Sequence, residues 1–188
     1  MISVSLSNSI DWEKFEFVGS PRVERRLSDL CGCFADEAAY GEALSHGDPL
    51  IYTVSSQAPA DGAGQLHYGL GMIAPGRVGR EYYLTKGHLH AWREAAEVYL
   101  GLAGEGFMLL EEEATGESRL LQLGKDRVVY VPGGTAHRTV NTGADPLVYI
   151  GVYPAGAGHD YGTIAEKNFR QVVTDRGGRP VAVDRAEY

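Results

Sequence analysis

Three histidines and one glutamate have the types and spacing of a site for a divalent metal ion. His88 and His90 are two residues apart, Glu97 follows them, and His137 lies in the segment Pro132-Gly133-Gly134-Thr135-Ala136-His137-Arg138-Thr139-Val140-Asn141. On a β-strand, residues two apart point to the same side, so His88 and His90 can reach one ion together. Neutral imidazoles with one carboxylate suit Fe, Mn, Ni, Zn or Co and leave positions open for a substrate. Each residue alone would fit a surface or turn position; together they predict one divalent metal per subunit.

The surrounding sequence predicts the elements that position these residues. Twenty-five glycines punctuate short apolar runs, a pattern typical of an all-β sandwich or barrel. We expect strands at 50–55, 65–73, 81–84, 97–102 and 147–153. A short helix is expected over 36–44, with Asp36 near its start.

Two of these strands alternate in an unusual way. Over 97–102, Val98, Leu100 and Leu102 face one side, and Glu97, Tyr99 and Gly101 face the other. Over 147–153, Val148, Ile150 and Val152 alternate in the same way with Tyr149, Gly151 and Tyr153. An aliphatic face with period two indicates a half-buried strand. The face of Tyr, Gly and a carboxylate suits the interior of a small barrel that holds a polar ligand.

Length and charge limit the classes of protein. The 188 residues fit one domain. Residues 1–48 are expected to form an N-terminal arm with short helices, and residues 49–188 a barrel with a C-terminal extension, within the same domain. A net charge of −8 argues against binding to nucleic acid or to a membrane surface. No apolar run approaches the roughly 20 residues of a membrane span.

The N-terminus and the cysteines suggest a cytoplasmic protein. Residues 1–6 lack the basic and long apolar regions of an export signal. Cys31 and Cys33 are separated by one residue, which is too close for an ordinary disulfide and wrong for a C-x-x-C pair. We expect both thiols to be reduced.

The metal-type residues lie in a pattern that resembles the two cupin motifs. H-x-H, a glutamate and Gly104 make up the first motif, and Pro132 to Asn141 matches the second in full. The first departs from the usual spacing, because six residues separate His90 from Glu97 where three or four are usual. The resemblance implies a cupin fold, a double-stranded β-helix or jelly-roll barrel, with His88, His90, Glu97 and His137 as metal ligands.

Longer stretches resemble the archaeal-type, metal-dependent cupin phosphoglucose isomerase family. They include Tyr83-Leu84-Thr85-Lys86-Gly87-His88-Leu89-His90 and Ala155-Gly156-Ala157-Gly158-His159-Asp160-Tyr161-Gly162-Thr163-Ile164-Ala165-Glu166-Lys167, and they span residues 22 to 167. The resemblance implies a homodimer that interconverts glucose 6-phosphate and fructose 6-phosphate, a step of glycolysis and gluconeogenesis. It implies Fe²⁺ as the first choice of metal, with Mn²⁺, Ni²⁺, Zn²⁺ and Co²⁺ as alternatives.

The resemblance also assigns parts of the chain to the substrate, a phosphorylated hexose. The phosphate is placed near Tyr52, Thr85 and the Gly87 backbone. The sugar is placed near four residues with a ring that can hydrogen bond: Tyr99, Tyr153, His159 and Tyr161. Of these, we expect His159 and Tyr153 to act in catalysis together with Glu97. Arg25, Arg26 and Asp29 are expected to be structural, in the arm or a dimer contact.

One departure concerns the phosphate. The resemblance leads us to expect a phosphate-contacting threonine on the strand before Pro75-Gly76, but the chain has Gly69-Leu70-Gly71 there. A hydroxyl donor is missing at that position, which bears on substrate affinity and range, including acceptance of mannose 6-phosphate.

The chemistry leaves alternatives open. An enediol route needs a base near the carbon, and Glu97 is the candidate; a metal-assisted hydride shift needs none, and Glu97 would then be a ligand alone. Two other classes use the same residues: a cupin dioxygenase, which calls for an apolar or aromatic substrate pocket, and a non-catalytic sugar-binding cupin, which does not need a complete ligand set.

Overall fold

The computed structural model describes residues 6–188. Residues 1–5, on which most of the prediction of no export signal rests, lie outside the described residues. Among residues 6–188, no helix combines the length and the apolarity that crossing a bilayer requires.

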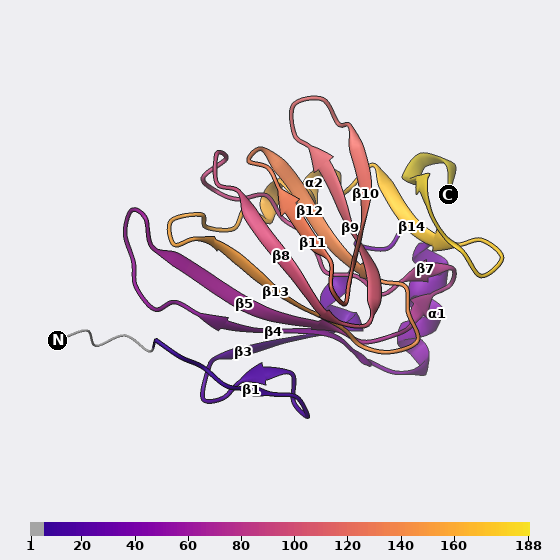
Figure 1. Ribbon diagram of the computed structural model, residues 1–188. Helices are drawn as coiled ribbons and strands as arrows, with labels where there is room; N and C mark the ends of the chain where they lie inside the picture. The colour runs from indigo at the N-terminus through magenta and orange to yellow at the C-terminus, as the bar shows by residue number, and fades with distance from the viewer. Residues whose placement is uncertain (1–5) are drawn as a thin grey trace.

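Two antiparallel sheets form the body of the molecule (Figure 1). The larger has six strands in the spatial order β11 (Val128–Val131), β8 (Glu97–Ala103), β13 (Leu147–Pro154), β5 (Leu66–Ile73), β4 (Leu50–Gln57) and β3 (Arg22–Arg26). The smaller has the order β10 (Ser118–Gly124), β9 (Glu105–Glu112) and β12 (Thr135–Asn141). The main hydrophobic core joins residues of both sheets, among them Ile73, Val129, Met108 and Val140. The predicted strands at 50–55, 65–73, 97–102 and 147–153 are confirmed, with ends that differ by one or two residues.

The two faces of β8 lie as their residue types predicted. Glu97, Tyr99 and Gly101 are buried and face the interior, whereas Val98 and Leu100 are exposed on the outside of the sheet. Polar and small side chains therefore line the inside of this wall. The aliphatic side chains of β8 form part of its outer surface.

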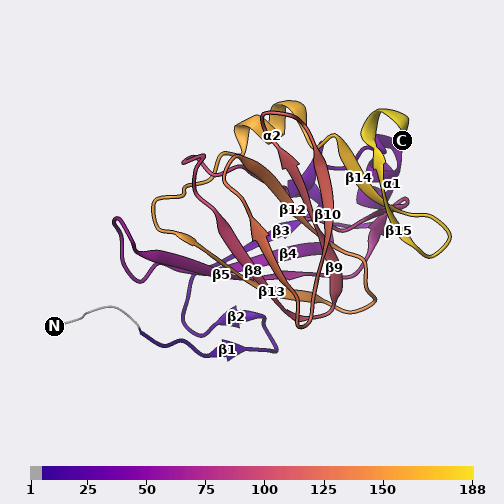
Figure 2. The same cartoon turned by 45° about the horizontal axis from the view of Figure 1, so that its top comes forward.

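The N-terminal arm contains more strand than the sequence suggested. Hairpin β1 (Ile10–Asp11) and β2 (Glu16–Phe17) covers part of the outer face of the six-stranded sheet, where Phe17 packs with Leu70, Met72 and Val148 (Figure 2). β3 pairs with β4 and so belongs to the sheet itself. The sequence did not indicate this strand, because four of its five residues are charged and both of its faces carry charge.

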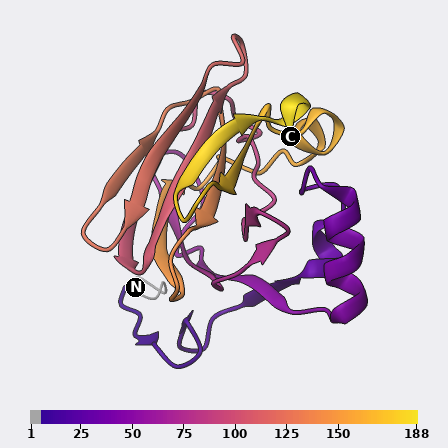
Figure 3. The ribbon, with the colours of Figure 1, turned by 90° about the vertical axis from the view of Figure 1, so that its right-hand side faces the viewer.

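The predicted helix over 36–44 is confirmed as α1 (Glu37–His46). The Asp36 side chain caps it by accepting a hydrogen bond from the Ala39 N–H at 2.9 Å. A 3₁₀ turn, η1 (Leu27–Leu30), precedes it and buries Leu27 and Leu30. Figure 3 shows α1, in purple, on the side of the molecule opposite the salmon-coloured strands β9 and β10.

The C-terminal extension closes one end of the structure. A four-stranded sheet has the order β15 (Pro180–Asp184), β14 (Gln171–Asp175), β7 (Glu81–Tyr82) and β6 (Arg77–Val78). α2 (Gly162–Lys167) precedes it, and a 3₁₀ turn, η2 (Arg185–Glu187), follows it. The strand expected at 81–84 is shorter than predicted: it ends at Tyr82, and Leu84 makes only an isolated bridge to Val140.

Candidate active site

The structure brings His88, His90, Glu97 and His137 together. One ligand-type atom from each residue lies within 4.8 Å of the corresponding atoms of the other three. Glu97 begins β8, His137 is on β12, and the two other histidines lie in the segment between β7 and β8. His90, Glu97 and His137 are buried, at 4%, 4% and 2% exposure.

Backbone carbonyls fix the orientation of two of the imidazoles. His90 Nδ1 lies 2.9 Å from the Ala95 carbonyl oxygen, and His137 Nδ1 lies 3.2 Å from the Thr135 carbonyl oxygen. In the neutral ring, donation from Nδ1–H to a carbonyl leaves the Nε2 lone pair as the free acceptor. This is the arrangement usual for histidines that ligate metals.

The atoms that face the centre of the cluster are acceptors. Glu97 Oε2 lies 3.2 Å from His90 Nε2 and 3.2 Å from His137 Nε2. His88 Nε2 and His137 Nε2 are buried without a hydrogen-bond partner among the described residues. Buried acceptors that converge without donors are costly. A cation between them would remove that cost, so the residues fit a divalent metal.

The longer spacing between His90 and Glu97 serves this site. Residues 91–96 form a turn in which the Ala95 N–H donates to the Trp92 carbonyl at 3.0 Å, and Ala95 supplies the carbonyl that orients His90. The same turn carries Arg93, which contacts Glu113 and Asp160. The extra residues therefore support one ligand and anchor a neighbouring loop.

Glu97 presents its two carboxylate oxygens to different surroundings. Oε2 faces the imidazoles, while Oε1 lies 2.5 Å from the position that a Cβ on Gly151 would occupy. Only glycine at residue 151 leaves that space to the carboxylate. Burial raises the pKa of Glu97, but its interactions with the neighbouring His137 and His90 rings outweigh burial and lower that pKa to about 2. The carboxylate is thus charged at neutral pH.

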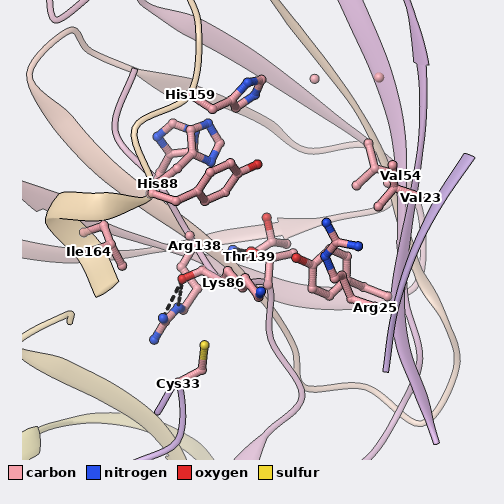
Figure 4. A pocket seen from close by; sticks show the side chains of 18 of the residues that line it. Val23, Arg25, Cys33, Val54, Lys86, His88, Arg138, Thr139, His159 and Ile164 are labelled. Carbon is pink, nitrogen blue, oxygen red and sulfur yellow. Dashed lines mark hydrogen bonds between the residues drawn. The ribbon is translucent and has the colours of Figure 1, made fainter. Parts of the chain in front are cut away.

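The cluster opens into one cavity of about 530 Å³. Figure 4 shows His88 and His159 near each other at one end, with Thr139 and Arg25 further along and Cys33 at the far end. All the predicted site residues except His90 line it: Tyr52, Thr85, Gly87, His88, Glu97, Tyr99, His137, Tyr153, His159 and Tyr161. The volume is in the range of small-molecule sites.

The residues predicted near the phosphate offer hydrogen-bond donors. Burial raises the pKa of Tyr52 to about 12, so its hydroxyl keeps its proton. Thr85 Oγ1 accepts from the Thr139 N–H at 3.1 Å, which leaves the Thr85 hydroxyl proton free to donate. Gly87 has φ +74°, and a Cβ there would lie 2.5 Å from Phe169. Glycine is therefore required for this close turn of the backbone beside the cavity.

The loop that carries His159 and Tyr161 is fastened over the histidines. The His159 and His88 rings are 4.6 Å apart, and His159 stacks on Tyr161 at 5.8 Å. Asp160 pairs with Leu89 through two backbone hydrogen bonds of 2.7 and 3.1 Å, and its carboxylate lies 2.6 Å from Arg93 Nη2. Burial lowers the pKa of His159, which favours the neutral imidazole.

Sequence reasoning missed or misplaced several cavity residues, among them two arginines and two cysteines. Arg25, expected in a structural or dimer role, lines the cavity instead. Arg138 is buried, stacks on Phe169 at 4.4 Å and donates to the Lys86 carbonyl, so it supports the 85–87 turn. Cys31 and Cys33 are free thiols, as predicted, but they also line the cavity. The spacing of these residues in the sequence did not predict that they line the cavity, because their positions depend on tertiary contacts.

An all-β barrel with three histidines and one glutamate gathered on its inner wall defines a cupin. A solved structure concerned with the mechanism of oxalate oxidase shares this fold, with a TM-score of 0.50 and 13% identity. The match covers 60% of this chain and 56% of that one, so the chain spans little more than half of that structure. Identity this low indicates the fold alone.

The sequence comparisons define the family more narrowly. A model of the family described as "Glucose-6-phosphate isomerase (GPI)" matches residues 24–185, and the chain belongs to this family. It is 42% identical over 188 residues to glucose-6-phosphate isomerase of Pyrococcus horikoshii, covering 100% of this chain and 99% of that protein. It is 44% identical over 179 residues to the Thermococcus kodakarensis protein of the same name, covering 95% and 94%. The predicted fold and family are confirmed.

Proposed function

We propose that this protein is a metal-dependent aldose–ketose isomerase that interconverts glucose 6-phosphate and fructose 6-phosphate. The observation that carries the proposal is one cavity that combines two kinds of chemistry. A buried cluster of metal-type ligands adjoins it, and hydroxyl and backbone donors line its wall. A phosphorylated hexose needs both: a site that acts on C1 and C2, and donors that hold the phosphate.

The metal would be held by His88, His90, Glu97 and His137. The donor set of three imidazoles and one carboxylate suits Fe²⁺, which we take as the first choice, and also Mn²⁺, Ni²⁺, Zn²⁺ and Co²⁺. When bound, the ion supplies a Lewis acid that polarises an oxygen of the substrate.

Glu97 is suited to move a proton between C1 and C2. Its Oε2 faces the imidazoles, and its Oε1 lies over Gly151, which also lines the cavity. One oxygen can therefore serve as a ligand while the other accepts a proton from carbon. The charged carboxylate is the form that a base requires.

Four rings surround the place proposed for the sugar. The ring centres of Tyr153 and His159 are 5.8 Å apart, and those of Tyr99 and His137 are 5.9 Å apart. Each tyrosine pairs an apolar ring with a hydroxyl, which suits a sugar. A neutral His159 can accept or donate a proton at the ring oxygen or the C1 hydroxyl, and we assign it the opening of the sugar ring. Tyr161 stacks on His159 and keeps its ring in place.

The phosphate would be held by donors on the cavity wall. The donors are the Tyr52 and Thr85 hydroxyls and the backbone at Gly87. Arg25 lies on the cavity wall, and its charge acts on the phenols of both Tyr52 and Tyr161. A permanent cation among neutral donors favours a phosphate dianion in a protein whose net charge is −8.

We infer a homodimer in the cytoplasm. Val98, Leu100, Val128 and Tyr130 form an exposed apolar row on the outer face of β8 and β11, with Val128 at 66% and Tyr130 at 60% exposure. A row of this kind suits the surface of a second copy. The charge change Val128→Glu should give monomers in light scattering, and Leu121→Glu on β10 is the control, because Leu121 is exposed on a different sheet. A dimer that survives Val128→Glu would place the contact elsewhere.

Cys31 and Cys33 suit a reducing compartment such as the cytoplasm.

A coupled assay tests the function. The protein is incubated with fructose 6-phosphate before chelation, after chelation and after addition of Fe²⁺, and glucose 6-phosphate is detected. We expect turnover that disappears on chelation and returns with metal. Turnover that chelation leaves unchanged would contradict a metal role. Oxygen uptake without isomerisation would favour the dioxygenase class.

A further inference from the structure

Gly71 and Tyr149 are complementary across two neighbouring strands. They are direct partners in the pairing of β5 with β13. A Cβ built on Gly71 would lie 2.4 Å from Tyr149 Cζ and 2.6 Å from its hydroxyl oxygen. Real side chains do not approach so closely. The phenol of Tyr149 therefore occupies the space that a side chain at residue 71 would fill.

This phenol is part of the cavity wall. Gly71 and Tyr149 both line the cavity, and Tyr149 is buried, with 6% exposure. Its ring lies 5.4 Å from the Tyr99 ring, which limits its movement. The side chain is thus held in one place by Gly71 below it and Tyr99 beside it.

The Tyr149 hydroxyl lies among the proposed phosphate donors. Tyr52 on β4 and Tyr149 on β13 lie on the two strands that flank β5, and both line the cavity together with Thr139. Thr139 also donates its backbone N–H to Thr85 Oγ1 at 3.1 Å. Residues 52, 85, 139 and 149 therefore bring four hydroxyl-bearing side chains to the wall of the same cavity.

We propose that the Tyr149 hydroxyl is a further substrate-binding donor beside the proposed phosphate donors, and that Gly71 is the residue that leaves room for it. This proposal depends on the proposed function, which identifies the ligand as a phosphate ester. It explains how a chain with glycine at residue 71 still supplies a hydroxyl there. Burial raises the pKa of Tyr149, so the hydroxyl keeps the proton that it donates.

The first test removes only the hydroxyl. Tyr149→Phe keeps the ring that fills the space over Gly71. The matched control is Tyr82→Phe, because Tyr82 is also buried, with 8% exposure, but lies outside the cavity lining. Binding of inorganic phosphate and of fructose 6-phosphate to the metal-stripped protein is measured by calorimetry, so that no result depends on turnover. Loss of one hydrogen bond to a charged partner predicts that Tyr149→Phe binds roughly tenfold to over a hundredfold more weakly. Tyr82→Phe should bind as the parent does.

The second test moves the hydroxyl across the strand pair. Gly71→Thr alone should destabilise the protein, because its Cβ meets the Tyr149 ring. The double variant Gly71→Thr/Tyr149→Ala frees that space and supplies a hydroxyl from residue 71. If the changes caused by the two single substitutions were simply added, they would predict weaker phosphate binding and a lower melting temperature than the double variant should show.

The outcomes separate this inference from the function. If Tyr149→Phe binds both ligands as the parent does while Tyr52→Phe binds them weakly, Tyr149 is a packing residue and the inference is wrong. If Tyr149→Phe, Tyr52→Phe and Thr85→Ala all bind as the parent does, the phosphate site lies elsewhere and both fail. If Tyr149→Phe weakens phosphate binding but the parent does not isomerise fructose 6-phosphate, the assignment of Tyr149 as a donor is correct and the proposed reaction is wrong.

Discussion

His88 and His137 pair with each other across an isolated antiparallel bridge. The His88 N–H donates to the His137 carbonyl at 3.2 Å, and the His137 N–H donates to the His88 carbonyl at 3.0 Å. Their rings are 4.2 Å apart. The backbone thus fixes the separation of two proposed ligands that are 49 positions apart in the chain.

This bridge leads to a prediction about metal content. His88→Ala or His137→Ala removes one ligand but leaves the backbone bridge intact. Both variants should fold and should lose metal and activity together, because three ligands bind more weakly than four. Elemental analysis checks the metal, and circular dichroism checks the fold. Stoichiometric metal in both variants would contradict the assignment, and His67→Ala, outside the cavity lining, serves as the control.

The sequence revealed the inner wall of the barrel because its composition was unusual. Tyr99 and Tyr153 alternate with aliphatic residues in two separate strands, so their faces could be assigned without a structure. The metal-type residues followed from motif spacing. Both patterns involve residues close together in the chain, so they can be recognised from the sequence alone.

The rest depends on register and packing between distant segments. Nothing near Gly71 in the sequence indicates that Tyr149 lies opposite it, because strand pairing sets that contact. Arg25 was assigned to the arm because β3 is charged on both faces, and only its pairing with β4 brings it to the cavity. Arg138 carries a charge that predicts exposure, yet it is buried against Phe169.

The phosphate donors lead to a second prediction. Tyr52→Phe and Thr85→Ala each remove one hydroxyl from the cavity wall. A hydrogen bond to a charged partner is worth roughly 1.5–3 kcal/mol, so kcat/KM for fructose 6-phosphate should fall about tenfold to over a hundredfold. Steady-state kinetics measure the change. Thr53→Ala is the control, because the buried Thr53 hydroxyl has no hydrogen-bond partner among the described residues and lies outside the cavity lining. Unchanged kinetics in both cavity variants would place the phosphate elsewhere.

The ion pair of Asp160 with Arg93 leads to a third prediction. Asp160→Asn weakens the attachment of the loop that carries His159 and Tyr161. An ion pair this exposed contributes little to global stability, so the melting temperature should barely change. Misplacement of His159 should still lower kcat/KM by roughly tenfold or more. Asp175→Asn is the control, since Asp175 pairs with Arg77 outside the cavity lining.

The pH dependence of this variant follows from the Asp160 pKa. Arg93 lowers that pKa to about 2. A carboxylate with a lowered pKa contributes its stabilising interactions above the ordinary aspartate pKa, and these are lost only as the pH falls toward 2. The ratio of parent to Asp160→Asn activity should therefore stay constant between pH 5 and pH 8. A ratio that changes steeply in this window would show that another group controls the loop.

Glu97 provides the sharpest prediction, because its two oxygens face different partners. Glu97→Gln keeps the shape of the side chain and one carbonyl oxygen, but it removes the basicity. If Oε1 takes the proton from carbon, metal should largely remain while kcat falls by about 100-fold or more, the usual scale of general-base catalysis. Turnover in deuterated water should then leave label at C1 or C2 of the product, since an enediol route exchanges the migrating hydrogen with solvent. A hydride shift gives a product without label. An unlabelled product, together with Glu97→Gln near full rate at saturating metal, would show that Glu97 is a ligand alone.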